Sequence, residues 1–224
     1  NPTGATYTRD ELRALAAVLE THDCLVLADD IYEKIVYDDF EVTNLVTLWP
    51  GLRERAIIVN GVSKTYAMTG WRIGYALGPS DVIAAAAKIQ SQSTSNPTSI
   101  AQAAALEAVA GPQEEVACMV REFHKRRDVI VKKLNAIDGL QCLKPQGAFY
   151  VFPRITAFLG KRANGKELRS PCDLADYLLE EARVAGVPGE DFGSNHHIRF
   201  SYATSLEDIE KGCARIGAAV AKLT

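Results

Sequence analysis

The spacing of apolar residues predicts that helices and short buried strands alternate in the first half of the chain. Behind a capping box that runs from Thr8 to Glu11, apolar side chains recur at helical spacing, so we expect an amphipathic helix that ends near Thr21. Three short apolar runs follow, each ended by acidic residues, Asn-Gly or Gly-Pro: residues 24–28, 56–59 and 73–77. Such runs are typical of strands buried on both faces of a parallel sheet that helices cover. The pattern therefore predicts an α/β fold.

The second half of the chain predicts a different arrangement. An alanine-rich helix, a polar linker and a helix begun by Pro97 lead into a long charged helix, with the ranges 81–90, 91–96, 97–110 and 112–136. Short strands then alternate with helices: strands at 140–143, 148–152 and 197–201, helices at 172–185 and 206–223. We place a domain boundary inside the long helix, which gives one domain of residues 1–118 and a smaller α+β domain of residues 119–224.

Composition and charge exclude several classes of protein. With 47% hydrophobic and 24% charged residues among 224, the chain is not disordered, collagen-like or a disulfide scaffold. Charges of both signs are interspersed and sum to −3, so we expect no nucleic-acid partner. The five cysteines form no C-x-x-C pair, so we expect no metal site and reduced thiols in the cytoplasm. No apolar run approaches the ~20 residues that span a bilayer, and we expect no membrane partner.

A lysine in a glycine-rich loop carries the strongest chemical signal. Lys64 follows the second apolar run, with the Ser63 hydroxyl beside it and the Arg72 guanidinium eight residues later. Three glycines of the same segment let the backbone approach a ligand closely: Gly61, Gly70 and Gly74. A lone loop lysine is usually solvated, but a lysine near cationic groups loses its proton more easily and attacks aldehydes. Lysine and phosphate-binding arginine together favour a pyridoxal phosphate site.

An acidic partner for such a cofactor is present at the end of the first apolar run. Asp29 and Asp30 stand where ligands bind in open α/β sheets, beyond the carboxyl end of a strand. On its own, this pair is more often a strand-to-helix cap than a binding site. Tyr32 changes that balance, because an acid and a phenol three residues apart can address two edges of one heteroaromatic ring.

With these residues in place, the chain resembles the class I/II pyridoxal-phosphate aminotransferases of fold-type I. It is most similar to the bacterial aspartate aminotransferase branch. The resemblance is carried by stretches that follow the family order along the whole chain: NPTGATYT, LADDIYE, NGVSKTYAMTGWRIGYALGP, PQGAFYVFP, VPGEDFG and HHIRFSYATS. The lysine segment with GWRIG is the most specific of them.

The resemblance implies a role for each residue of the cofactor site. Lys64 would form the Schiff base with pyridoxal 5′-phosphate and move the substrate proton between Cα and C4′. Asp29 would pair with the pyridinium nitrogen and keep it protonated, and Tyr32 would hydrogen-bond the phenolic oxygen. Arg72, with Ser63, would hold the phosphate. The implied catalytic residues are therefore Lys64, Asp29 and Tyr32.

The resemblance also implies a substrate-binding pair. Arg199, in the stretch HHIRFSYATS, would grip the α-carboxylate of the substrate as a bidentate pair, a geometry that lysine does not reproduce. Asn1 would contact the substrate and share the phenolic oxygen of the cofactor with Tyr32. Without the other motifs, Arg199 would read as a solvated arginine on a strand.

The implied activity is reversible transfer of an amino group between an amino acid, with aspartate expected, and a 2-oxo acid by a ping-pong mechanism. Prephenate is a further acceptor in this branch, and the implied assembly is a homodimer in the cytoplasm. Two alternatives stay open. A lyase or synthase of the same fold shares Lys64, Asp29 and Arg199, and a transcription regulator can carry an aminotransferase-like domain that senses pyridoxal phosphate.

The chain departs from the family in two respects. Gly61 stands where many relatives carry a second serine three residues before the lysine, so one hydroxyl for the phosphate is missing or supplied elsewhere. Family members are also nearly twice as long. We therefore expect the latter part of the large domain plus most of the small domain, and a chain that by itself binds pyridoxal phosphate poorly.

Overall fold

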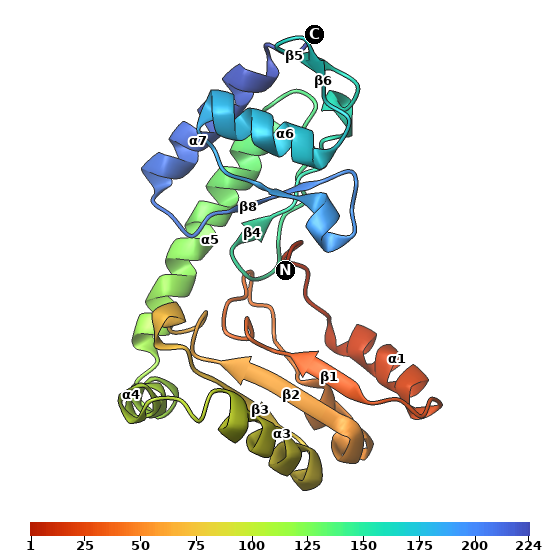
Figure 1. Cartoon of the computed structure of the whole chain (residues 1–224), viewed down its shortest axis with the longest axis vertical. Helices are drawn as coiled ribbons and strands as arrows, with labels where there is room; N and C mark the ends of the chain where they lie inside the picture. The colour runs from red at the N-terminus through yellow and green to blue at the C-terminus, as the bar shows by residue number, and fades with distance from the viewer. The chain divides into compact units, whose positions relative to one another are not determined.

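A computed structural model describes all residues 1–224, and the chain divides into two compact units (Figure 1). The N-terminal unit is Thr6–Met119, and the C-terminal unit is Val120–Thr224 together with Asn1–Ala5. The division falls inside helix α5, Glu114–Asn135. The first five residues thus belong with the C-terminal part of the chain, whereas the sequence placed them in a domain of residues 1–118.

The N-terminal unit alternates helices and strands, as the apolar pattern predicts. Its elements are α1 (Arg9–Glu20), β1 (Val26–Asp29), α2 (Leu45–Leu48), a 3-10 turn (Pro50–Arg55), β2 (Ala56–Gly61), a second 3-10 turn (Thr69–Trp71), β3 (Gly74–Leu77), α3 (Ser80–Ser93) and α4 (Ser99–Ala110). The predicted capping box is confirmed: Thr8 Oγ1 accepts from the Glu11 N–H at 3.3 Å, and Glu11 Oε2 accepts from the Thr8 N–H at 2.7 Å. The expected linker at residues 91–96 is wrong in part, because α3 continues to Ser93 and α4 begins only after the cap Thr98.

The register of the three-stranded sheet brings three chain positions to one edge. The strand order is β1-β2-β3, with β1 parallel to β2 and Asp29 opposite Val59. β3 runs antiparallel to β2, with Gly74 opposite Gly61. The carboxyl ends of β1 and β2 and the start of β3 therefore lie side by side. We call this the carboxyl edge of the sheet, defined by Asp29, Gly61 and Gly74.

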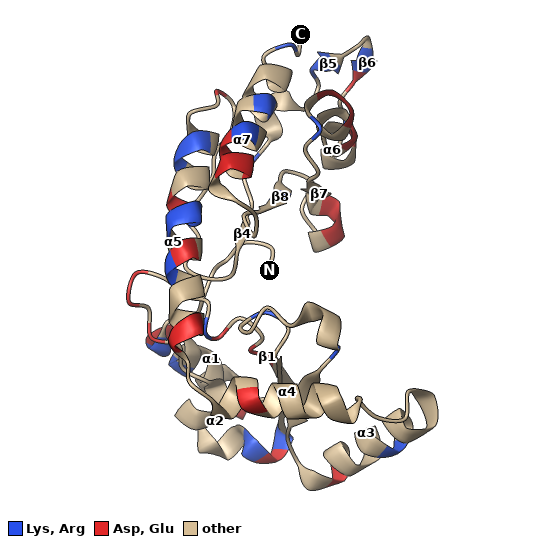
Figure 2. Cartoon of the chain, turned by 90° about the vertical axis from the view of Figure 1, so that its left-hand side faces the viewer, with Lys and Arg blue, Asp and Glu red and all other residues tan.

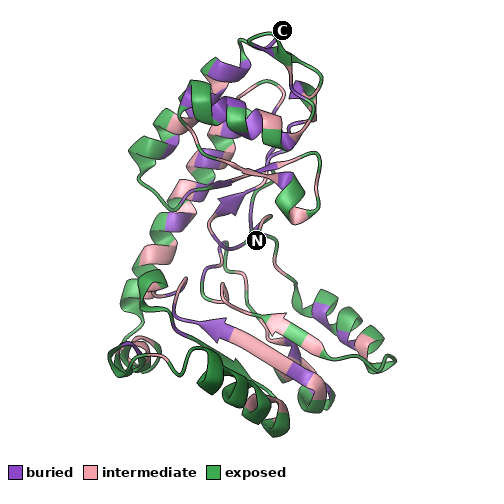
Figure 3. Cartoon of the chain, viewed as in Figure 1, coloured by how far each residue is buried: buried purple, intermediate pink, exposed green.

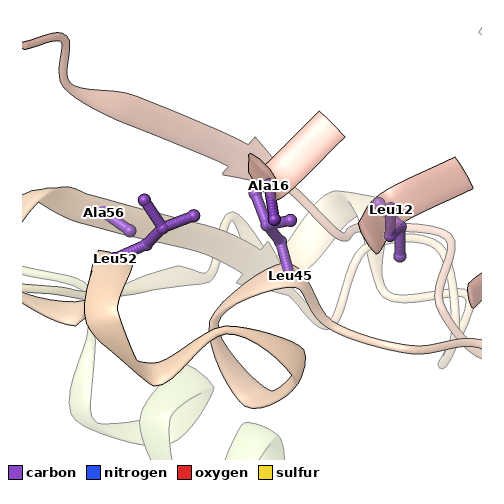
Figure 4. Packing of buried hydrophobic residues seen from close by; sticks show 5 residues of the cluster. All are labelled: Leu12, Ala16, Leu45, Leu52 and Ala56. Carbon is purple, nitrogen blue, oxygen red and sulfur yellow. The ribbon is translucent and has the colours of Figure 1, made fainter. Parts of the chain in front are cut away.

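The expectation that these strands are buried on both faces is wrong for β1 and β3. β1 alternates half-buried and exposed residues, with Leu27 69% exposed, and β3 is exposed throughout (Figure 3). In the core of this unit, α1, α2 and the 3-10 turn that follows α2 pack against β2. The buried residues are Leu12, Ala16, Leu45, Leu52 and Ala56 (Figure 4). A strand is buried on both faces only when a layer covers each face. Helix α3 has no buried residue, so it does not form such a layer.

The C-terminal unit packs helices against a small antiparallel sheet. Its elements after α5 are β4 (Tyr150–Val151), a 3-10 turn (Thr156–Phe158), the hairpin β5 (Arg162–Ala163) and β6 (Lys166–Glu167), α6 (Pro171–Tyr177), a π-helical turn (Leu178–Ala182), β7 (Val187–Pro188), a 3-10 turn (Gly189–Phe192), β8 (Ile198–Ser201) and α7 (Leu206–Val220). The sheet order is β4-β8-β7. The strand expected at 140–143 is wrong, since only an isolated bridge forms there, between Gln141 and Arg154.

The cores of the two units differ in completeness. Many large side chains of the C-terminal unit are fully buried, among them Leu134, Val151, Ile155, Leu174, Ile198 and Tyr202. In the N-terminal unit, by contrast, α4 is almost free of charged residues (Figure 2). It still exposes Ile100 and Leu106. None of the helices combines the length and the apolar composition that a membrane span needs.

Candidate active site

Two consecutive aspartates end β1, and the structure separates their roles. Asp29 is the last residue of β1 and Asp30 follows it, and their side chains have different partners. Asp30 is hydrogen-bonded by the Asn44 amide, and burial raises the pKa of its carboxyl group. Asp29 remains at the carboxyl edge, where its Oδ1 accepts from the Ile31 N–H at 3.3 Å. Tyr32 follows in a turn and is half-buried.

Lys64 lies in the turn that follows β2, and its amine is unpaired. Val62 and Thr65 are buried and anchor the turn, while Ser63 and Lys64 between them are half-buried. The turn closes through the Ala67 N–H, which donates to the Lys64 carbonyl at 3.2 Å. The side chain of Lys64 forms no hydrogen bond or ion pair. The sequence thus places a free amine and a free hydroxyl just beyond the carboxyl edge.

Arg72 is held in a strained backbone conformation immediately before β3. Its φ of +54° and ψ of +49° are left-handed, as is the φ of +53° at Ala67 earlier in the same loop. A non-glycine residue pays about 1–2 kcal/mol for this conformation, and such strain is concentrated at functional sites. The Arg72 Nη1 donates to the Thr69 carbonyl at 2.7 Å, which orients the guanidinium. It lines a cavity of about 700 Å³ together with Gly70, Trp71 and polar residues that precede α4.

Gly61 lies so close to the neighbouring strand that there is little room for a side chain. A Cβ at this position would lie 3.0 Å from Gly74 Cα and 3.0 Å from the Ile73 carbonyl oxygen. The departure noted in the sequence, a glycine where relatives carry serine, therefore has a packing reason here. A serine at position 61 would require β3 to shift by a few tenths of an ångström, and the loop that carries Arg72 leads into β3.

The C-terminal unit holds the second group of predicted residues. Arg199 lies on β8, and its Nη1 donates to Asn1 Oδ1 at 2.7 Å. Its guanidinium also lies between two aromatic rings, 4.5 Å from the centre of Tyr150 and 4.8 Å from that of Phe192. Two such cation–π contacts restrict the rotation of the guanidinium and leave its remaining N–H groups for an anion.

Sequence reasoning missed both rings, although each lies inside a quoted stretch. Tyr150 belongs to PQGAFYVFP and Phe192 to VPGEDFG, where the alternation of apolar residues favours a reading as core. Phe192 also meets Phe152 edge to face, and the His197 ring stacks on Phe152 with a centroid distance of 4.8 Å. Burial lowers the pKa of His197, so the ring is a neutral imidazole at neutral pH.

The predicted residues therefore form two groups, one in each unit. Asp29, Tyr32, Ser63, Lys64 and Arg72 come from the carboxyl edge of the N-terminal sheet and the loops that extend it. Asn1 and Arg199 are paired in the C-terminal unit. The first group supplies an acid, a phenol, a hydroxyl, a free amine and a guanidinium, and this donor set fits the ring, aldehyde and phosphate of pyridoxal phosphate.

Comparison with known proteins identifies the family. The family model for aminotransferase class I and II matches residues 1–216, and the chain belongs to this family. It is 51% identical to the aspartate/prephenate aminotransferase of Cereibacter sphaeroides, an alignment that covers 100% of the chain and 56% of that protein. The chain spans just over half the length of the curated relatives it matches.

Solved structures agree. The crystal structure of the aspartate aminotransferase from Rhizobium meliloti matches 100% of the chain and 56% of its own, with a TM-score of 0.95 and 49% identity. An aromatic aminotransferase from Pyrococcus horikoshii matches 99% of the chain and 58% of its own, with a TM-score of 0.88 and 38% identity. The expected fold, that of fold-type I aminotransferases with a partial large domain, is confirmed.

Proposed function

We propose that this chain carries the catalytic lysine and the carboxylate-binding arginine of a pyridoxal-phosphate-dependent aminotransferase. The observation that carries the proposal is the placement of three groups around the carboxyl edge of the sheet. Asp29 lies at the end of β1, the unpaired Lys64 amine follows the end of β2, and Arg72 precedes the start of β3. The reaction is the transfer of an amino group between an amino acid, with aspartate first, and a 2-oxo acid. The identity of about half to the aspartate/prephenate aminotransferase supports aspartate and adds prephenate as an acceptor.

Each unit takes one part of this work. Residues 1–118 would form the part of the large cofactor-binding domain that is present and residues 119–224 the small domain, except that Asn1–Ala5 pack with the small one. When bound, pyridoxal phosphate supplies an aldehyde for an amine and a ring that accepts an electron pair from the substrate Cα. Asp29 would hold the ring nitrogen, Asn1 and Tyr32 the phenolic oxygen, and Ser63 and Arg72 the phosphate.

The chain's own groups then account for proton transfer and substrate orientation. No hydrogen bond or ion pair holds the Lys64 amine in place, so its side chain is free to move the proton of the substrate Cα to C4′ of the cofactor. The Arg199 fork would bind the α-carboxylate with two parallel hydrogen bonds, which would restrict the orientation of the substrate. Tyr150 and Phe192 keep the fork in one plane.

A homodimer in the cytoplasm is part of the proposal. Helix α4 is apolar on most of its surface, with Ile100 74% and Leu106 69% exposed and Glu107 as its only charged residue. A helix that is hydrophobic all round is buried in an assembled protein. Sedimentation of a full-length protein at micromolar concentration would give twice the mass of one chain.

The test is a half-reaction in a full-length version of the protein built to the length of its relatives. With cofactor and aspartate but no 2-oxo acid, one equivalent of oxaloacetate forms per site, and the cofactor absorption changes to that of its amine form. A lyase or synthase would instead release product catalytically in this assay. Lys64→Ala abolishes the reaction, whereas Lys34→Ala, at an exposed lysine of the same unit, leaves it intact. Retention of the half-reaction in Lys64→Ala would refute the assignment.

A further inference from the structure

The largest fully buried side chain of the protein is a cation that the proposed reaction does not use. Arg127 lies on α5 and is 0% exposed, although α5 carries charged residues over much of its length (Figure 2). Taking a guanidinium out of water is unfavourable unless its N–H groups are paired. Its partners therefore show what the charge is used for.

Arg127 joins α5 to the loop of residues 144–148. Its Nε and Nη2 pair with Asp128 Oδ1 at 3.0 and 2.9 Å. Its Nη1 donates to the Pro145 carbonyl at 3.1 Å. The side of the guanidinium that faces away from Asp128 thus holds the backbone of a loop 18 residues further along the chain.

That loop in turn carries the first residues of the chain. The N–H groups of Gln146 and Gly147 both donate to the Gly4 carbonyl, each at 2.9 Å. Gly4 has a φ of +69°, and a Cβ there would lie 2.5 Å from Pro145 Cβ. The turn at Gly4 therefore lies against the loop with no space for adjustment.

The other end of the turn presents Asn1 to Arg199. The Asn1 Oδ1 accepts from Arg199 Nη1 at 2.7 Å, and the end of the loop is held to the strand of Arg199 by the Tyr202 hydroxyl, which donates to the Ala148 carbonyl at 3.0 Å. All these contacts lie within the C-terminal unit. They form a continuous connection from Arg127 through Pro145 and Gly4 to Asn1.

We propose that Arg127 is a positioning residue: it fixes the 144–148 loop so that the turn at Gly4 presents Asn1 to the guanidinium of Arg199. The fork of Arg199 is then oriented before a carboxylate arrives. This inference rests on the proposed function of Arg199. Arg127 itself touches no substrate and acts through the loop and the turn.

The experiment uses the full-length protein loaded with pyridoxal phosphate and succinate, an unreactive dicarboxylate, as the probe. Arg127→Met should raise the dissociation constant of succinate roughly ten- to hundredfold, the effect expected for an ångström-scale displacement of a binding group. Arg127→Lys keeps the charge and one donor group, so its dissociation constant for succinate should lie between those of the unmodified protein and Arg127→Met. Lys132→Met, which removes an exposed cation from the same helix, should bind succinate like the unmodified protein.

Two further measurements separate positioning from general stability. Hydrogen exchange at the Gln146 and Gly147 amides should become faster in both Arg127 variants, while amides of α7 stay protected. In an Asn1→Ala background, Arg127→Met should weaken succinate binding no further, because both changes interrupt the same connection. If Arg127→Met does not fold, succinate binding and hydrogen exchange of Arg127→Lys test the proposal instead.

Unchanged succinate affinity in a folded Arg127 variant would overturn the proposal, as would full additivity with Asn1→Ala. Failure of the unmodified protein to bind succinate would instead refute the carboxylate role of Arg199. In that case hydrogen exchange still tests Arg127. If exchange at Gln146 and Gly147 is as slow in both Arg127 variants as in the unmodified protein, Arg127 does not anchor the 144–148 loop.

Discussion

Replacing Gly4 by alanine tests how tightly the first turn of the chain is seated. A Cβ at Gly4 would lie 2.5 Å from Pro145 Cβ and 2.7 Å from the Gly147 carbonyl oxygen. The φ of +69° adds a conformational penalty for any residue with a Cβ. The left-handed conformation costs about 1–2 kcal/mol and overpacking typically about 1–3 kcal/mol. We therefore expect Gly4→Ala to lower the free energy of unfolding of the C-terminal unit by about 2–5 kcal/mol.

Gly160→Ala is the matched control. Gly160 also has a positive φ, +86°, but nothing lies within 4 Å of its Cβ position. Gly160→Ala should lower the free energy of unfolding only by the conformational penalty of about 1–2 kcal/mol. Urea denaturation of both variants, followed by far-ultraviolet circular dichroism, measures the difference, which isolates the contact with Pro145 and Gly147. Equal destabilisation of the two variants would mean that the turn can move away from the loop, and the connection to Asn1 would lose its support.

Three further predictions follow from the site and the packing. Arg199→Lys should raise the KM for aspartate about ten- to hundredfold in steady-state assays, because lysine cannot form the bidentate pair. Cys142 and Cys213 should resist alkylation at pH 8 in native protein while exposed Cys24 reacts, since burial raises the pKa of the Cys142 thiol to about 12 and that of Cys213 to about 11; mass spectrometry measures the modification. The 224-residue chain alone should show weak absorption from lysine-bound cofactor, because β1 and β3 remain uncovered. Equal absorption to a full-length protein would contradict this last expectation.

The sequence predicts those features of the fold that depend on neighbouring residues. The helix start at Thr8 needs only the side chains of Thr8 and Glu11, so its capping box appears in the structure as written. The helix expected at 172–185 shows the opposite case. It breaks into α6 and a π-helical turn that ends at Arg183, a left-handed residue with no glycine or proline to announce it. The π-helical turn packs against α7, which is remote in sequence, so its surroundings are not visible in the local pattern.

Burial of the strands could not be predicted because it depends on layers rather than on the strands themselves. Leu25 and Leu27 have the composition of a doubly covered strand, yet both are exposed at the edge of a three-stranded sheet. The apolar run is of the kind found in strands that a layer covers on each face. Since the relatives are nearly twice as long, the same run is consistent with further layers in a longer protein.

The candidate site contains residues that act on a cofactor or substrate and residues that hold them in place, and the sequence reveals only the first kind. Groups that act on a cofactor or substrate have distinctive types and spacing, so Lys64, Asp29 and Arg199 stand out in the sequence. The residues that hold them do not. Arg127 lies in a run of charged residues, KRRD, that is typical of a solvated helix face, and only its burial against Pro145 reveals another role. A guanidinium removed from water must be matched by partners, so a buried arginine marks a backbone that has to stay in place.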